Sequence, residues 1–346
     1  MRIEGISLAV PSLCITNCDI ISKVREANST LPPHIVNRYC RVLKQLLLHA
    51  GADTRYVRDR DRGETAFELI VDAVHSALRK ADLKPEQLDL LIFCGVGRGF
   101  LEPSNAAFIC RTLNINCDYF DISDACMSWI RSLHISYNFL ANRTYSKILI
   151  VNGEFTVFEY GVPEIFAIQA LDRLAYTFPA FTIGEAASAT VLVQSPAEWF
   201  FRFRSNTSLA SLCTIPLTGY QEFSEPDPRL GLNGVNRLVS FGQELTSAAL
   251  EEMVRFVTET YEDPLKFDLW FPHAASARLC AVAARSLGLG ERLYSRVFPR
   301  YGNLVSASIP AAMAMAEQEG ILVRGDRIVL SPASAGMSLA LISGQY

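Results

Sequence analysis

Short apolar runs alternate along the chain with longer stretches in which apolar residues recur every three or four positions. The apolar run at residues 88–94 follows such a stretch at about 65–81, and the run at 147–151 follows another at about 126–141. Apolar runs of this length are typical of buried strands, whereas the three- or four-residue repeat is typical of amphipathic helices. The pattern therefore predicts an α/β protein whose sheets are covered by helices on both faces.

Two segments far apart in the chain follow a similar pattern. Residues 181–193 and 329–341 each contain several small residues (Gly, Ala and Ser) that are followed by a strand-like run. Small residues allow backbones to approach closely, as a tight bend beside a buried site requires. If each segment ends one half of a duplicated protein, the chain divides into residues 1–195 and 196–346. The alternative is that both segments are ordinary hairpins.

The bulk composition narrows the class of protein. A chain of 346 residues exceeds what one compact core usually holds, and its 50% apolar and 20% charged residues are ordinary for a globular protein. The longest apolar runs are far shorter than the roughly 20 residues of a membrane-spanning helix. The net charge of −4 argues against nucleic acid as a bulk partner. A polar stretch rich in Gly and Pro at 224–236 predicts a long surface loop.

The chain has nine cysteines and five histidines, the residues that could form disulfides or bind a metal ion. The number of cysteines is odd and no Cys-x-x-Cys pair occurs, so neither a disulfide framework nor a zinc site is predicted. Glu4 interrupts the only apolar region near the N-terminus, which argues against a secretory signal peptide. These observations predict a cytoplasmic protein that contains no metal.

Cys126 is the first candidate for chemistry. It lies in the segment Phe-Asp-Ile-Ser-Asp-Ala-Cys-Met-Ser-Trp (residues 120–129), between a predicted strand ending near Ser123 and a predicted helix. The positive end of a helix dipole and its free N–H groups favour the thiolate, which is the form that attacks a thioester. The alternative is a core cysteine that acts as a small hydrophobic residue, as expected for most other cysteines of the chain.

Two polar residues further along the chain could assist this cysteine. His273 follows a strand-like apolar run and a proline, a position suited to an active-site loop. Asn303 follows a glycine that allows a sharp turn, and it precedes an Ala-rich helix with Pro310 in its first turn. The order Cys, His, Asn also occurs in papain-like proteases, but the surroundings of Cys126 and the α/β alternation do not fit that class.

Three motifs of the chain resemble those of ketoacyl-ACP synthase III. The family's Phe-Asp-x-x-Ala-Ala-Cys-x-Gly-Phe, around its nucleophile, is similar to residues 120–129. Its Pro-His-Gln-Ala-Asn-x-Arg resembles Pro-His-Ala-Ala-Ser-Ala-Arg at 272–278, and its Gly-Asn-Thr-Ser-Ala-Ala-Ser-Ile-Pro resembles Gly-Asn-Leu-Val-Ser-Ala-Ser-Ile-Pro at 302–310. Weaker similarities occur at 51–55, 102–104 and 334–336.

The resemblance covers nearly the whole chain in the family's order, and it implies a thiolase-like fold. That fold has two similar halves in a five-layered αβαβα arrangement. The half formed by residues 1–195 would carry Cys126, and the half formed by 196–346 would carry His273 and Asn303. Members of this fold usually dimerise, so a homodimer is implied. The substrates would be thioesters of CoA or acyl carrier protein, with no further cofactor and no nucleic-acid or membrane partner.

Carried over by resemblance, the catalytic residues are Cys126, His273 and Asn303. Cys126 would take an acyl group from CoA or a carrier protein and form an acyl-enzyme. His273 and Asn303 would hold the thioester carbonyl of a malonyl-type substrate and stabilise the enolate formed when CO₂ leaves. The backbone N–H groups of Cys126 and Gly336 would form the oxyanion hole.

Two arginines are candidates for binding the substrate's carrier. Arg278 lies five residues after His273, where its guanidinium could pair with the phosphate of the pantetheine arm. The alternative for Arg278 is an ordinary arginine on a helix surface. Arg55 belongs to the early arginine loop of the family and would bind the substrate or its carrier.

The chain departs from the family near each catalytic residue. Asp124 replaces a small apolar residue, and its carboxylate would oppose thiolate formation unless it is paired. Ser128 and Trp129 replace Gly-Phe, with consequences expected for the acyl pocket. The Gln and Asn beside the histidine are replaced by Ala274 and Ser276, and the Thr-Ser after Asn303 by Leu304 and Val305.

A further departure concerns the donor of the acyl group. Counting back from Gly51, the Trp and Arg that often grip CoA fall at Gln45 and His49. This difference shifts weight from acyl-CoA towards a carrier-bound donor. Together the departures predict a specialised relative from a secondary-metabolite pathway, not the housekeeping initiator of fatty-acid synthesis.

Three functions remain open from the sequence. The first is decarboxylative condensation, which Asn303 favours because relatives that only move an acyl group often lack this residue. The second is an acyltransferase that forms an ester or amide, which the altered residues around His273 favour. The third is a non-catalytic partner subunit of a heterodimeric synthase, against which the presence of Cys126, His273 and Asn303 argues.

Overall fold

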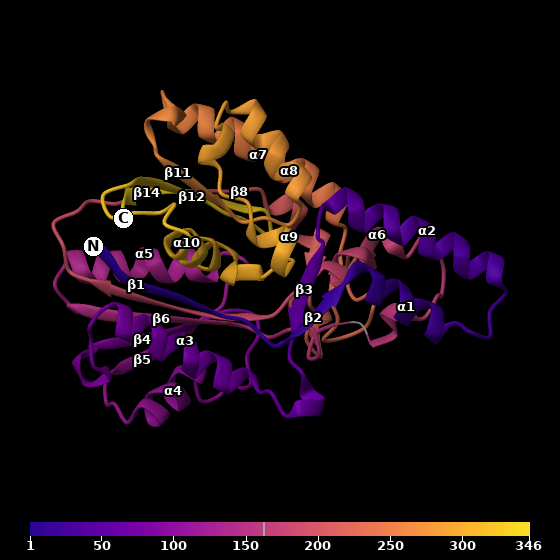
Figure 1. Ribbon diagram of the computed structural model, residues 1–346, viewed down its shortest axis with the longest axis horizontal. Helices are drawn as coiled ribbons and strands as arrows, with labels where there is room; N and C mark the ends of the chain where they lie inside the picture. Colours follow the sequence, from indigo (N-terminus) through magenta and orange to yellow (C-terminus); the bar gives the residue numbers. More distant parts are fainter. Residues whose placement is uncertain (162) are drawn as a thin grey trace.

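Two mixed β-sheets form the centre of the computed structural model, which describes residues 1–161 and 163–346 (Figure 1). The strands of the first sheet are, in spatial order, β1 (Arg2–Ala9), β7 (Ala186–Val193), β6 (Lys147–Glu154), β4 (Leu90–Cys94) and β5 (Asp118–Ile122). β7 runs antiparallel to both β1 and β6, whereas β6, β4 and β5 are parallel to one another. β4 and β6 are buried along almost their whole length, as their continuous apolar sequences predict.

The second sheet repeats the arrangement of four strands of the first. Its main strands are, in spatial order, β8 (Phe200–Ser205), β14 (Ser338–Gln345), β12 (Arg327–Ser331) and β11 (Leu269–Pro272), and the short β13 (Ala333–Ser334) also pairs with β14. β14 is antiparallel to both neighbours and β12 is parallel to β11, just as β7 is antiparallel to β1 and β6, and β6 is parallel to β4. The small-residue segments 181–193 and 329–341 thus lead into equivalent strands. The division at residue 195 falls between the two sheets and stays a prediction.

Helices and sheets alternate in five layers (Figure 1). The helices are α3 (Ala66–Lys80) and α4 (Asn105–Leu113) on the outer face of the first sheet, α5 (Ser128–Ala141) and α10 (Ser308–Gln318) between the sheets, and α7 (Gly242–Thr260) and α8 (Ala277–Ser286) on the outer face of the second. α10 is apolar on every side because it packs against both sheets, so its residues from Ser308 to Ala316 are all buried. The predicted thiolase-like αβαβα fold is confirmed.

Local signals placed most helices where the sequence predicts them. α3 begins after Thr65, whose side chain and that of Glu68 form a capping box. α10 has Pro310 near its start and ends before Gly320, as predicted. Two boundaries differ from prediction: β6 extends to Glu154, and α5 begins at Ser128, two residues after Cys126.

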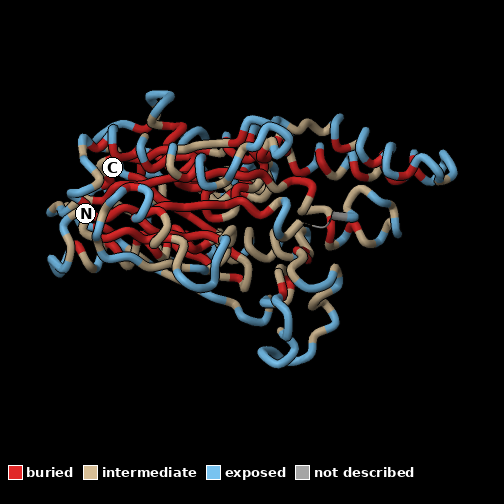
Figure 2. The backbone as a smooth tube through the Cα atoms, turned by 90° about the horizontal axis from the view of Figure 1, so that it is seen from below, coloured by how far each residue is buried: buried red, intermediate tan, exposed pale blue. Residues whose placement is uncertain are grey.

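A smaller group of elements, here called the cap, covers one end of the sheets (Figure 1). It consists of β2 (Leu13–Thr16), α1 (Asn17–Ala27), α2 (Pro33–Ala50), β3 (Thr54–Val57), η3 (Pro163–Phe166), α6 (Leu174–Thr177), η4 (Phe178–Thr182), β9 (Cys213–Thr214) and β10 (Val239–Ser240). The cap has its own apolar core, which includes Ile20, Leu43 and Phe181. Figure 2 shows continuous burial along the layered part and alternating buried and exposed segments in the projecting end that carries α2.

Two further predictions concern the surface and the membrane. Residues 224–236 contain no helix or strand and are mostly exposed or half-buried, which confirms the predicted surface loop. Among the described residues, no helix has both the length and the apolar character needed to cross a bilayer.

Candidate active site

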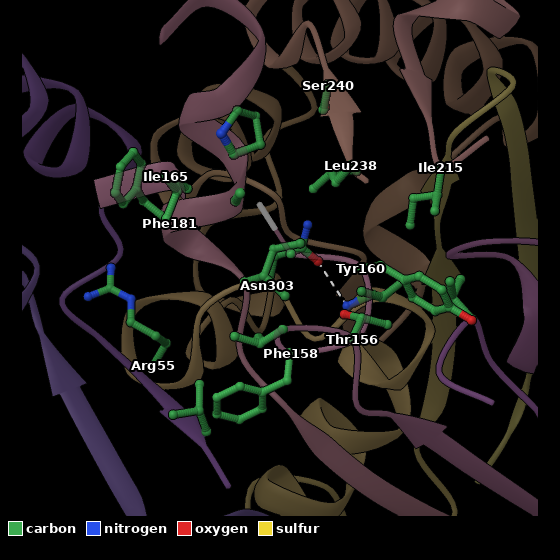
Figure 3. A pocket seen from close by; sticks show the side chains of 18 of the residues that line it. Arg55, Thr156, Phe158, Tyr160, Ile165, Phe181, Ile215, Leu238, Ser240 and Asn303 are labelled. Carbon is green, nitrogen blue, oxygen red and sulfur yellow. Dashed lines mark hydrogen bonds between the residues drawn. The ribbon is translucent and has the colours of Figure 1, made fainter. Parts of the chain in front are cut away.

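A cavity of about 750 Å³ lies where the ends of the strands of the first sheet meet the cap (Figure 3). Its wall is largely apolar and includes Ile15, Phe158, Ile165, Phe181, Ile215 and Leu238. Cys126 and Asn303, which are far apart in the sequence, both line it. A mostly apolar cavity with a few convergent polar groups is the usual form of a small-molecule site.

Cys126 lies in a tight turn between β5 and α5. The preceding residue, Ala125, has a φ of 44°, a left-handed conformation that is uncommon for residues other than glycine. The Ser128 hydroxyl donates to Ala125 O (2.7 Å) and accepts from Asp124 N (2.8 Å), and the N–H of Met127 donates to Asp124 O (2.8 Å). These bonds fix the turn and direct Cys126 to the cavity.

The Cys126 thiol is held in its neutral form by its surroundings. Burial raises its pKa, and the neighbouring Cys213 thiol and Glu154 carboxyl raise it further. The backbone N–H of Ala335 and the hydroxyl of Ser334 act in the opposite direction, but with smaller effect. Burial therefore outweighs any effect of the helix N-terminus, which was expected to favour the thiolate. A reaction at this sulfur must remove its proton as the thioester is attacked.

Asn303 lies between α9 (Val297–Tyr301) and the short helix η9 (Val305–Ala307). Its backbone is fixed by pairing with the segment before β7: Asn303 N donates to Thr182 O (2.8 Å), and Gly184 N donates to Asn303 O (3.1 Å). Its side-chain Oδ1 accepts from Val305 N (2.9 Å), the bond drawn as a dashed line in Figure 3. The amide nitrogen points away from that bond and into the cavity (Figure 3), so Asn303 presents a donor.

The residue before Asn303 must be glycine. Gly302 has a φ of 74°, and a Cβ at this position would lie 2.3 Å from Thr182 O and 3.2 Å from the Cβ of Arg55. Any side chain would push Asn303 away from the strand that holds it. The sharp turn predicted from this glycine is thus confirmed.

His273 lies directly after β11, at the end predicted from the sequence. Its backbone N–H donates to Ser331 O (3.4 Å), and Ser331 begins the segment that carries Ser334 and Ala335 beside Cys126. The ring is not among the groups that line the cavity. Burial lowers the pKa of His273 to about 4, so the imidazole is neutral at physiological pH. Its Nδ1 is buried and has no partner among the described residues.

Gly336 lies in the turn between β13 and β14, one residue after Ala335, which lines the cavity. Gly336 has a φ of 74° and Met337 a φ of 46°, so the turn is left-handed at two consecutive positions. This places the turn close to the Cys126 sulfur. Its role in an oxyanion hole stays a prediction.

The two candidate arginines differ in their surroundings. Arg55 is buried, and its guanidinium donates two hydrogen bonds to Asn17 Oδ1 (3.0 and 2.9 Å) and one to Ile15 O (3.3 Å). Burial lowers its pKa to about 10. Arg278 is on the first turn of α8, where its Nη1 lies 2.7 Å from the His49 ring. Arg278 is accessible to a phosphate, whereas Arg55 forms hydrogen bonds within the cap. The carrier-binding roles of both arginines stay predictions.

The departures from the family's motif have structural explanations. The Asp124 carboxylate is paired with Arg131 (2.8 Å), which removes the expected conflict with the cysteine. Ser128 stabilises the turn that holds Cys126. Trp129 is buried between the sheets, where its Nε1 donates to Thr190 Oγ1 (3.1 Å). Neither Ser128 nor Trp129 lines the cavity, so the expected effect on the acyl pocket is not seen in the described wall.

Sequence reasoning missed two residues beside the site. Cys213 on β9 lines the same cavity as Cys126, and nothing in its local sequence distinguishes it from a core cysteine. Glu154 is fully buried at the end of β6. A weak signal for Glu154 was available, because it lies three residues after the apolar run that ends at Val151, where the buried strand could continue. No group of three or more His, Cys, Asp or Glu side chains in the described ranges 1–161 and 163–346 could hold a metal ion.

The chain is similar to known proteins along most of its length. The C-terminal family model of 3-oxoacyl-[acyl-carrier-protein (ACP)] synthase III matches residues 262–343. A β-ketoacyl-[acyl-carrier-protein] synthase III from Clostridium tetani is 26% identical over 353 residues, covering 98% of this chain and 96% of the relative. An acyl-CoA:acyl-CoA alkyltransferase from Xanthomonas campestris is 26% identical over 311 residues, covering 84% of this chain and 85% of the relative.

Solved structures show the same fold. A crystal structure of Xanthomonas campestris OleA with bound lauric acid and lauroyl-CoA superposes with a TM-score of 0.81 at 21% identity, covering 99% of this chain and 98% of that one. A 3-oxoacyl-(acyl carrier protein) synthase III from Xanthomonas oryzae gives a TM-score of 0.79 at 20% identity, with coverage of 99% and 98%. The chain therefore has a thiolase-like fold, and the C-terminal family match and the relatives show that it is similar to ketoacyl-ACP synthase III and related condensing enzymes.

Proposed function

We propose that the protein loads an acyl group onto Cys126 and joins it to a malonyl-type thioester by decarboxylative Claisen condensation. The observation that carries this proposal is the presence of Cys126 and Asn303 in one apolar cavity, with the Asn303 amide nitrogen free to donate. His273, neutral at physiological pH and with a buried Nδ1 that has no partner in the described part of the chain, is the proposed third member of the site.

In the first step, the Cys126 sulfur attacks the thioester carbonyl of the donor. The proton of the thiol passes to the departing thiol of CoA or the carrier protein, and the acyl group remains on the sulfur. A protonated resting thiol suits this exchange, because the thiolate need form only when a thioester is in place. The backbone N–H groups of Cys126 and Gly336 hold the oxyanion of the tetrahedral intermediate.

In the second step, the carboxylate of the malonyl-type thioester leaves as CO₂, and an enolate forms. His273 and Asn303 donate hydrogen bonds to the enolate oxygen. The carbanion attacks the acyl group on Cys126, a carbon–carbon bond forms, and Cys126 leaves as the thiolate, which takes up a proton from water to restore the resting thiol. Two neutral donors fit this task, because they stabilise the developing negative charge without protonating the carbanion.

The size of the cavity favours a long acyl chain. A methylene group needs about as much room as a water molecule, roughly 30 Å³, so about 750 Å³ holds a chain well beyond a short starter. Arg58, one of the cations at the wall, is paired with the buried Glu185 (2.8 Å) and with Glu159 (2.8 Å). Because this charge is neutralised, the cavity keeps its apolar character. The lauric acid and lauroyl-CoA bound to OleA agree with such a chain.

The biological setting is proposed from the sequence. A homodimer acting in a specialised, secondary-metabolite pathway fits the departures around Cys126 and His273. Arg278 is the residue proposed to bind the phosphate of the donor's pantetheine arm, because it is exposed and its guanidinium contacts the His49 ring. The donor is an acyl-CoA or an acyl-carrier thioester.

Acyl loading tests the proposal directly. The protein is incubated with acyl-CoA and acyl-carrier thioesters from two to sixteen carbons, on the order of the chain lengths that the cavity admits, and its intact mass is measured. The expected result is a mass gain for the longer chains that is absent in Cys126→Ala. A malonyl thioester labelled in its free carboxyl group is then added, and labelled CO₂ should be released only by the loaded enzyme. No mass gain with any donor would overturn the proposal and favour the non-catalytic partner subunit.

A second candidate differs only in the acceptor. The Xanthomonas campestris relative is named an acyl-CoA:acyl-CoA alkyltransferase, and the cavity here has room for more than one short chain. The second substrate would then be another acyl thioester that loses a proton and not CO₂. A carbon–carbon product formed from acyl-CoA alone would favour this candidate, whereas an ester or amide product with an alcohol or amine would identify an acyltransferase.

A further inference from the structure

Glu154 is a buried carboxylate that lies just below the wall of the cavity. It occupies the last position of β6, is completely inaccessible to solvent, and is not used in either step above. A buried carboxylate must be hydrogen-bonded or protonated. What it binds therefore indicates what it does.

Each contact of Glu154 is with a segment that borders the cavity. Its carboxylate accepts from Val96 N (3.2 Å) and from Gly97 N, in the loop that follows β4. It also accepts from Ser306 N (3.2 Å) and from the Ser306 hydroxyl. The same hydroxyl accepts from Asn152 Nδ2 (2.7 Å), so two side chains of β6 form hydrogen bonds with Ser306.

Ser306 is close to Asn303 along the chain, and the residue between it and Leu304 is strained. Val305 has a φ of 49°, which is an outlier for a β-branched residue. In this conformation Val305 N donates to Asn303 Oδ1 (2.9 Å), and the next residue is Ser306. A strained backbone of this kind persists only where surrounding contacts hold it. Those contacts are the bonds from Ser306 to Glu154 and Asn152.

We infer that Glu154 is a positioning residue for Asn303. Through Ser306 it holds Val305 in the left-handed conformation, Val305 N then binds Asn303 Oδ1, and Asn303 Nδ2 is left facing the cavity. Glu154 touches no substrate in this arrangement. The inference rests on the proposed function for the role of Asn303, but the orientation of the Asn303 amide can be measured without any reaction.

Glu154 helps the step that uses Asn303, but it disfavours the thiolate of Cys126. Glu154 raises the pKa of the Cys126 thiol, so its removal should leave acyl loading unchanged or make it faster. A change of this residue should therefore slow the step that needs Asn303 and should not slow the step that needs Cys126. A residue with only a structural role would slow both.

The variants are Glu154→Gln, Ser306→Ala, Asn303→Ala and the double variant Glu154→Gln with Asn303→Ala. Asp89→Asn is the matched control: its carboxylate also accepts three hydrogen bonds, from Ser146 and Lys147, but at the opposite ends of β4 and β6. For each, acyl loading is measured by intact mass and CO₂ release is measured on the loaded enzyme. Circular dichroism and the melting temperature show that each variant is folded.

We expect Glu154→Gln to slow CO₂ release by about 10- to 100-fold, as misplacement of a reacting group does, with loading not slower than in the wild type. Ser306→Ala should show the same selectivity with a smaller loss, and it serves if Glu154→Gln fails to fold. The double variant should match Asn303→Ala, because a residue that acts through Asn303 has nothing left to position. Equal slowing of both steps, or a further loss in the double variant, would overturn the inference.

Nuclear magnetic resonance separates this inference from the proposed function. With asparagine labelled by ¹⁵N, the side-chain signals of Asn303 are identified by their loss in Asn303→Ala. In Glu154→Gln these signals should shift and broaden, and in Asp89→Asn they should not. If the wild type releases no CO₂ but this result is obtained, the positioning role stands and the proposed reaction fails. Unchanged Asn303 signals in Glu154→Gln would contradict the positioning role whatever the reaction is.

Discussion

Two loops at the ends of strands, one in each half of the protein, show how differently similar scaffolds can hold a reactive side chain. The nucleophile turn, residues 123–128, joins β5 to α5 and carries Cys126. The histidine loop, residues 273–276, joins β11 to α8 and carries His273. Both follow a strand and precede a helix. They differ in how far their polar groups are paired by hydrogen bonds.

The nucleophile turn is closed on itself. The Ser128 hydroxyl bonds at both ends of the turn, and Asp124 is paired with Arg131. The histidine loop instead leaves the Nδ1 of His273 buried without a partner among the described residues. A buried polar group costs about 1–3 kcal/mol when it is left unpaired. The first loop is therefore fixed by its own hydrogen bonds, whereas the second leaves a buried polar group unpaired among the residues that the structure describes, as the proposed binding of substrate by His273 requires.

The largest expected effect separates the two loops by reaction step. Cys126→Ala should abolish acyl loading, because it removes the sulfur that attacks the thioester. His273→Ala should keep loading within about threefold and should slow CO₂ release by about 100- to 1000-fold, the usual result of removing one donor to a developing oxyanion. Intact mass and labelled CO₂ report the two steps. If His273→Ala also loses acyl loading, the two loops do not each serve a separate step of the reaction.

The next effect is the dependence of the protein's stability on pH through Glu154, which lies near Cys126. Burial raises the pKa of Glu154 to about 7 from the ordinary 4.5, even though Ser306, Val96 and Gly97 donate to it. The folded protein therefore holds this proton between pH 4.5 and 7 where the unfolded chain releases it. The contribution to stability is fully present below pH 4.5 and is lost as the pH rises through 7, by about 3 kcal/mol.

Urea unfolding at several pH values tests whether this contribution to stability falls as the pH rises. The free energy of unfolding of the wild type minus that of Glu154→Gln should fall as the pH rises from 4.5 to 8, because glutamine does not titrate. Asp89→Asn is the control, since the hydrogen bonds of Ser146 and Lys147 lower the pKa of Asp89 and shift its effect to more acid pH. A difference for Glu154→Gln that stays constant over this range would contradict the raised pKa.

A smaller effect compares one serine in each loop. Ser128→Ala removes two hydrogen bonds of 2.7–2.8 Å from a fully buried position and should lower the free energy of unfolding by about 1–3 kcal/mol. Ser276→Ala removes two longer contacts of 3.4 Å, to Leu279 N and Ala50 O, and should lower it by about 1 kcal/mol or less. Thermal and urea unfolding give both values. Equal losses would weaken the contrast between the closed turn and the open loop.

The smallest effect is expected at Asp124. Its ion pair with Arg131 is half-exposed, with 39% and 32% of the two side chains accessible, so the pair should contribute about 1 kcal/mol or less. Asp124→Asn should therefore change the stability little and should alter the rate of Cys126 alkylation by iodoacetamide by less than about threefold. A large acceleration would mean that the carboxylate, although paired, controls the thiol.

Much of the fold could be predicted from the sequence, because its signals are local. The apolar runs at 88–94 and 147–151 are strands β4 and β6, and α3 follows Thr65, where the helix-like stretch at about 65–81 was predicted to begin. The duplicated small-residue segments lead into β7 and β14, which occupy equivalent places in the two sheets. Periodicity and capping act within a few residues, so one sequence is enough to read them.

The candidate site was predicted in part. Motif resemblance identified Cys126, His273 and Asn303, and the structure brings the first and third to one cavity. Cys213 and Glu154 were missed, since neither belongs to a motif. The strength of burial around Cys126 was also missed: the helix signal favoured a thiolate, but desolvation by surrounding residues holds the thiol neutral.

The sequence by itself determined the α/β alternation, and its motifs led to the prediction of Cys126 as the nucleophile with His273 and Asn303 as its partners. Only the tertiary structure decided which polar groups are already paired and which remain for substrate. Whether Asp124 opposes Cys126 depends on Arg131, and whether Asn303 faces the cavity depends on Val305 and a chain of contacts from β6. Hydrogen bonding and desolvation act through space between residues far apart in the chain, and a local pattern cannot encode them.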